Sequence, residues 1–182
     1  MSFDSNNLIM RVGLALAIGM AVGIVRGWQQ REEPAGQRTA GVRTFALAGL
    51  LGGAGAILAR ALSEPLLLGI LLAVFGTVFA WFSYRETSEE QTFSVTGTVA
   101  ALVVFALGAL AVAGDPLTAA AGGVATAGLL ASREVLHGFL QKLSWVELRS
   151  ALLLLAMTVI VLPILPDKPI SHFDTLSPRD MW

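Results

Sequence analysis

The chain has 182 residues, of which 55% are hydrophobic and only 14% are charged, and its formal net charge is -1. Soluble domains carry about 25% charged residues, so this composition excludes an ordinary soluble domain. A near-neutral chain lacks the basic surface that nucleic acid requires, and a chain without cysteine has no disulfide, thiolate metal site or thiol nucleophile.

The hydrophobic residues gather in six blocks that short polar stretches separate. A hydrocarbon core about 30 Å thick is crossed by about 20 helical residues, and backbone groups inside it need internal hydrogen bonds. The predicted fold class is therefore all-α, a polytopic integral membrane helical bundle with about six transmembrane helices in the lipid bilayer. These spans are predicted at residues 8–28, 44–62, 66–84, 94–113, 116–131 and 149–165.

The connections between the blocks contain helix start and stop signals. Asp115 followed by Pro116 is typical of an N-cap with proline at the first helical position. Residues 63–65, Ser-Glu-Pro, predict a similar short connection, at which one helix ends and the next begins. Ser144 and Glu147 have the spacing of a capping box, which predicts a new helix before the last span.

Residues 132–143 have an amphipathic helical pattern. Their apolar side chains recur at i, i+3, i+4 and i+7, at Leu136, Phe139, Leu140 and Leu143, and polar side chains cover the other face. This pattern predicts an interfacial amphipathic helix in the headgroup plane.

Two domains are expected, a transmembrane domain at 1–165 and a Pro-rich polar C-terminal tail at 166–182. With the N-terminus taken as external, the inner connections hold eight Lys and Arg residues and the outer ones four. The positive-inside rule then predicts that both termini are external and that the 26–43 and 132–148 loops are cytoplasmic.

Glycines repeat every four residues in the first two spans. Gly19, Gly23 and Gly27 share one face of the first span, and Gly49 and Gly53 continue the pattern in the second. Small residues at this spacing allow close contact between helix backbones. The seam could pack helices within one protomer or join two protomers.

Four arginines and two glutamates lie in the stretch 26–44, which connects the first two spans. Arg26 and Arg43 stand at the ends of those spans, and ionisable residues at that depth suggest function. We expect both arginines to form one polar cluster near the cytoplasmic boundary, with Glu32 or Glu33 as partners. A solvated positive loop is the alternative.

No catalytic constellation is present. The Ser and Thr residues lack a nearby base, and the interiors of the spans contain no Asp, Glu or Lys. We therefore expect no enzyme activity and no cofactor, and we leave the metal site unassigned. A cation path would depend on backbone carbonyls and hydroxyls, among them the hydroxyl of Thr98.

Two segments carry a family resemblance. Residues 19–28 (GMAVGIVRGW) and 40–53 (AGVRTFALAGLLGG, which contains Thr44) resemble the signature of the MgtC/SapB family of bacterial inner-membrane proteins. Residues 131–138 and 162–167 resemble the N-terminal half of a longer branch, in which a second membrane domain of unknown function follows.

The sequence departs from this family pattern at two acidic positions. Val25 stands where the family has an acidic residue before the arginine, and Thr98 stands where it has a glutamate. Both changes remove carboxylates that could meet a cation or an arginine. The branch also continues beyond a motif similar to residues 177–182. Together with the glycine face of the first span and the absence of carboxylates in the spans, this predicts a homodimer or a second membrane subunit as partner.

The resemblance implies a multi-pass protein of the bacterial inner membrane in magnesium (divalent cation) transport or homeostasis, with Mg2+ as a candidate ligand. The alternative is a non-transporting membrane adaptor or regulatory subunit that binds another integral membrane protein.

Overall fold

The computed structural model describes residues 5–29, 31, 40–90 and 95–161. All regular secondary structure in these residues is helical, which confirms the all-α prediction. The elements are α1 (Ser5–Gln29), α2 (Val42–Ala61), α3 (Leu66–Glu90), α4 (Thr96–Ala113), α5 (Pro116–Ala131), α6 (Arg133–Lys142), α7 (Trp145–Ala156) and the π-helical turn η1 (Met157–Val161).

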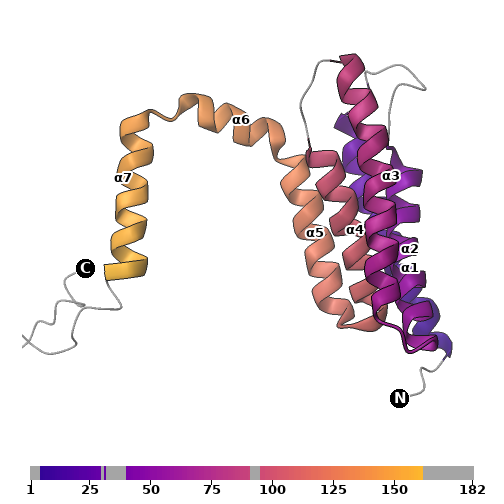
Figure 1. The fold of residues 1–182 in the computed structure, drawn as a ribbon. Coiled ribbons are helices and arrows are strands. Elements are labelled where there is room, and N and C mark those ends of the chain that lie inside the picture. The colour runs from indigo at the N-terminus through magenta and orange to yellow at the C-terminus, as the bar shows by residue number, and fades with distance from the viewer. Residues whose placement is uncertain (1–4, 30, 32–39, 91–94, 162–182) are drawn as a thin grey trace, which may run out of the picture. The chain divides into compact units, whose positions relative to one another are not determined.

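The chain forms two compact units, Met1–Arg133 and Glu134–Trp182. In the first unit, α1 to α5 run alternately up and down (Figure 1). Helix α1 packs against α2, α4 and α5, whereas α3 contacts only α2 and α4 among the described helices. The ends of α1 and α5 therefore lie at the same end of the bundle as the starts of α2 and α4.

Four helices are long and apolar enough to cross a membrane, in α1, α2, α3 and α4. Helix α5 has 16 residues, about 24 Å at 1.5 Å per residue, and is shorter than the hydrocarbon core. Helices α6 and α7 qualify only together, as a pair bent by 106°. Length and composition thus support four or five spans in the described residues, where the sequence predicted about six.

The core of the first unit combines small residues with a few aromatic rings. Phe45 and Phe105 are fully buried, and the ring centroid of Phe45 lies 6.2 Å from that of Phe79. Phe75 stacks on Phe105 with centroids 5.7 Å apart. These contacts join α2, α3 and α4, since aromatic pairs at such distances attract each other beyond the burial of their surface.

The turn between α2 and α3 ends the helix with the stop that the sequence predicted. Ser63 adopts a φ of 57°, in the left-handed region. The N–H of Glu64 donates to the carbonyl of Ala59 at 2.9 Å, and the N–H of Ser63 donates to the carbonyl of Arg60 at 3.2 Å. This pair of bonds is a Schellman motif, which satisfies carbonyls at the end of the helix.

The predicted start of α5 is also confirmed. The Asp115 carboxylate accepts a hydrogen bond from the backbone N–H of Thr118 at 2.7 Å, and Pro116 opens the helix. The bond from the Thr118 hydroxyl, followed by the backbone bond, holds the pKa of Asp115 below its usual range. The cap therefore stabilises the folded state above the ordinary pKa of the carboxyl, and this contribution is lost as the pH falls through the lowered value.

The second unit contains the predicted amphipathic helix as α6. The predicted capping box starts α7, because the N–H of Glu147 donates to Ser144 Oγ at 3.3 Å and the N–H of Ser144 donates to Glu147 Oε2 at 2.8 Å. Phe139 and Leu140 on α6 are exposed in the single chain. Their insertion into a headgroup layer stays a prediction, and the tail at 166–182 lies outside the described residues.

Candidate functional site

Three of the predicted site residues lie at one end of the first unit. Arg26 lies in the last turn of α1, Arg43 in the first turn of α2, and Thr98 in the first turn of α4. The alternating directions of these helices bring the three turns to the same end (Figure 1).

Arg26 reaches across from α1 to α4. Gly97 is buried beneath its guanidinium, because a Cβ atom added to Gly97 would lie 2.7 Å from Nη2 of Arg26. The Nε atom of Arg26 is shielded from solvent, and its side chain is half-buried as a whole. The missing side chain at Gly97 is what allows the charge to lie against the start of α4.

Gln29 extends this connection from α1 to α5. Its side-chain amide donates a hydrogen bond to the backbone carbonyl of Leu130, in the last turn of α5. Carbonyls in a last helical turn have no partner within their own helix, so this bond satisfies one of them. The last turn of α1 thus holds both neighbouring helices at the site.

The structure places the other predicted site residues differently. Arg43 is exposed, whereas Thr44 and Thr98 are half-buried. A direct contact between Arg26 and Arg43 therefore stays a prediction. The two glutamates expected as partners, Glu32 and Glu33, lie outside the described residues.

The starts of α2 and α4 favour anions. The residues that precede α2 and α4, Gly41 and Val95, make no side-chain cap hydrogen bond, and neither helix has an acidic residue in its first turn. Helix N-termini carry partial positive charge, and Arg26 and Arg43 add to it. Arginine forks suit carboxylates and phosphates, and they repel metal cations. The described residues also contain no group of three or more His, Cys, Asp or Glu that could hold a metal ion.

The predicted glycine seam lies in contacts between helices of the same chain. A Cβ atom on Gly19 would collide with the Phe45 carbonyl, and one on Gly23 would lie 2.7 Å from Val42 Cα, so both glycines bring α1 close to α2. Gly27 is less crowded, with Val42 Cγ2 at 3.6 Å from its added Cβ. This face of α1 is therefore covered by α2 within the protomer.

The second half of the seam joins α2 to α1 and α4. An added Cβ on Gly49 would collide with the Ala15 carbonyl, and one on Gly53 would lie 3.1 Å from Val112 Cγ2. Sequence reasoning missed Gly52 and Gly108, which make equally close contacts between α2 and α4. Their presence as glycines in predicted transmembrane spans is the feature of the sequence that could have predicted these contacts.

Arg11 makes another contact between helices that the sequence did not indicate. Its Nη1 atom donates to the carbonyls of Val112 at 3.1 Å and Gly114 at 2.9 Å, at the end of α4. A cation at a helix C-terminus is stabilising, and here it also satisfies carbonyls that the helix leaves unpaired. Residues so distant in sequence gave no sign of this pairing.

The model of the MgtC family matches residues 12–139, which includes all of the candidate site. The chain belongs to the MgtC family. Together with its apolar helices, this membership makes it a membrane protein. No curated protein and no solved structure matches the chain. Within this MgtC family member, the matched region begins next to Arg11 in α1 and ends in α6.

Proposed function

We propose that this MgtC family member acts in magnesium homeostasis at the bacterial inner membrane by binding another integral membrane protein, without conducting Mg2+ itself. Family membership supports the connection to magnesium homeostasis. The observation that carries the adaptor role is the close backbone contact along α1, α2 and α4.

These three helices leave little space between them. An added Cβ on Gly49 would collide with the carbonyl of Ala15 in α1, and one on Gly108 would collide with the carbonyl of Gly49. Backbone therefore lies directly on backbone at both contacts. Mg2+ gives up its water reluctantly and needs a path wide enough for a partly hydrated ion. Such contacts favour a static bundle over a conduit.

The charges of the site also argue against conduction of Mg2+. Mg2+ prefers oxygen ligands, usually carboxylates, and the interiors of the six predicted spans contain no Asp or Glu. At the candidate site, the structure places Arg26 in the last turn of α1 and Arg43 in the first turn of α2. Their guanidinium groups suit a carboxylate on a partner protein, either a second copy of the chain or a second membrane subunit.

Magnesium entry into proteoliposomes tests this proposal. Vesicles that contain the purified protein and a trapped magnesium-sensitive dye should take up Mg2+ no faster than protein-free vesicles. An established Mg2+ channel reconstituted in the same lipid provides the positive control. Uptake above the protein-free rate would show that the chain conducts Mg2+ and would overturn the adaptor proposal.

We also propose an orientation in the membrane, in which the end of the bundle that holds Arg26 and Arg43 faces the cytoplasm and both termini are external. Trp28 and Tyr84 are 67% and 70% exposed, in the last turn of α1 and the second half of α3, as expected for aromatic residues at a membrane boundary. Since the chain has no cysteine, each introduced cysteine is the only target for a thiol reagent. A reagent that cannot cross the membrane should label Ser2→Cys and leave Gln37→Cys unlabelled in intact cells. The opposite labelling pattern would reverse the orientation.

A further inference from the structure

A groove with apolar walls runs between α3 and α4, away from the arginine site. Its cavity measures about 470 Å³. Its lining includes Pro65, Leu68, Gly69, Phe105, Ala106 and Ala113. Cavities of this size commonly hold small ligands in proteins.

The groove has a cause in the packing of α3 on α4. An added Cβ on Gly76 would lie 2.9 Å from Leu102 Cδ2, so the two helices are in close contact there. About two turns nearer the start of α3, an added Cβ on Gly69 would have no atom within 4 Å. The helices are thus close at Gly76 and open at Gly69.

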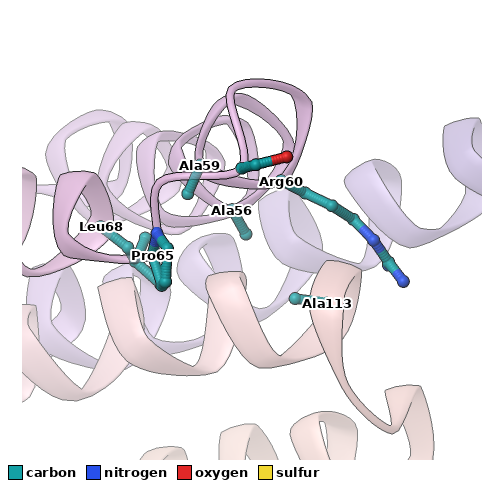
Figure 2. A pocket seen from close by; sticks show the side chains of 7 residues that line it. Ala56, Ala59, Arg60, Pro65, Leu68 and Ala113 are labelled. Carbon is teal, nitrogen blue, oxygen red and sulfur yellow. The ribbon is translucent and has the colours of Figure 1, made fainter.

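The open end of the groove leads to a charged residue. A second cavity, of about 480 Å³, shares Pro65, Leu68 and Ala113 with the groove and is also lined by Arg60 and Ser63. In Figure 2, Pro65 and Leu68 lie on one side of this cavity and the extended Arg60 side chain on the other. The apolar groove therefore continues to the side chain of Arg60 in the last turn of α2, at the end of the bundle opposite the arginine site.

Arg60 also lines a third cavity, of about 280 Å³, together with apolar side chains that include Leu8, Ile57 and Val112. One cation is thus flanked by two hollows with mainly apolar walls. A phospholipid has one phosphate and two acyl chains, so its chemistry matches this arrangement. A single partner helix would present one continuous rod instead.

Arg60 lines both cavities beside the groove, whereas two other charged groups at this end form their bonds elsewhere. Arg11 is bonded to the carbonyls at the end of α4, and Asp115 is bonded to Thr118 as the cap of α5. Glu64 lies exposed in the α2–α3 turn and does not line the groove.

We propose that this groove binds one anionic phospholipid per chain, with an acyl chain between α3 and α4 and the headgroup phosphate at Arg60. Arginine binds phosphate through its planar fork of donors. Basic groups between transmembrane helices are a known way to select anionic headgroups. This lipid site lies at the opposite end of the bundle from Arg26 and Arg43. An experiment that contradicts lipid binding there therefore does not contradict the proposed function.

Native mass spectrometry of the full chain in mixed micelles of phosphatidylglycerol and phosphatidylcholine tests the proposal. The wild-type protein should retain one phosphatidylglycerol in preference to phosphatidylcholine. Arg60→Gln should lower this preference about fivefold, since one basic group near anionic lipid contributes about 1 kcal/mol. Gly69→Leu should fill the groove and lose retention of both lipids.

Gly128→Leu is the matched control, because an added Cβ on Gly128 also meets no atom within 4 Å and Gly128 lies on α5, away from the groove. It should retain lipid as the wild type does. Ala106→Leu, at an exposed position that lines the groove, replaces Gly69→Leu if that variant does not fold. Unchanged lipid retention in a folded groove-filling variant would overturn the proposal, as would an unchanged headgroup preference in Arg60→Gln. A shift from dimer to monomer on filling the groove would overturn it too, and would identify the occupant as a second chain.

Discussion

Replacing Gly23 with leucine is expected to destroy the folded bundle. The added Cβ alone would lie 2.7 Å from Val42 Cα, and that neighbour is backbone, which cannot move aside without moving α2. The remainder of the leucine side chain would force α1 and α2 farther apart. Overpacking a core typically costs about 1–3 kcal/mol, and a collision with backbone lies at or beyond the upper end of this range. Size-exclusion chromatography in mild detergent should show aggregated protein and little folded species.

Gly13→Leu is the control for this prediction. Gly13 lies on the same helix, but an added Cβ there meets no atom within 4 Å. The control should elute as the wild type does, which separates the effect of the contact from the general effect of leucine in α1. A folded Gly23→Leu protein that elutes as a smaller species than the wild type would contradict the prediction, because it would show that this face joins two protomers.

Replacing Arg26 with alanine is expected to cause the largest loss of function without loss of the fold. The side chain is half-buried over the start of α4, so its removal takes away a positive charge that lies against Gly97. Growth in limiting magnesium of a bacterium that lacks its own copy is the measurement, with protein level in the membrane checked by immunoblot. Arg26→Ala should restore little of the growth that the wild-type chain restores.

Two further variants make this test specific. Arg85→Ala removes an exposed arginine from α3 and should support growth as the wild type does. Gly97→Ala keeps every charge but places a methyl group 2.7 Å from the present Nη2 position, so the flexible end of Arg26 must shift. We expect intermediate growth from this variant. Wild-type growth from Arg26→Ala at normal protein level would contradict a functional role for the residue.

The glycine seam also restricts how the protein assembles. Because α2 covers the Gly19 and Gly23 face of α1 within the chain, a homodimer or a second subunit must use another surface. The outer side of α3 is such a surface, since Trp81 and Phe82 are exposed there. Assembly with a partner is part of the proposed function.

Much of the fold was determined by local sequence. Long apolar blocks must form helices in hydrocarbon, because no water is available to bond the backbone. The caps at Asp115 and Ser144 were equally predictable, since each bond joins residues three positions apart. The stop at Ser63 follows from the same short-range chemistry, and α6 forms where the amphipathic pattern predicted it.

The number of spans was less predictable. Helix α5 is apolar throughout but only 16 residues long, and apolar composition alone does not distinguish a full span from a short helix packed against its neighbours. Its burial against α1 and α4 depends on contacts between segments far apart in the chain.

By itself, the sequence determined that Arg26 and Arg43 flank one connection and that glycines line one face of α1. Only the tertiary structure decided that Arg26 reaches α4 over Gly97, that Arg11 bonds to the end of α4, and that the glycines serve contacts inside the protomer. The physical reason is that helix periodicity determines which residues share a face, whereas packing between helices determines what that face meets.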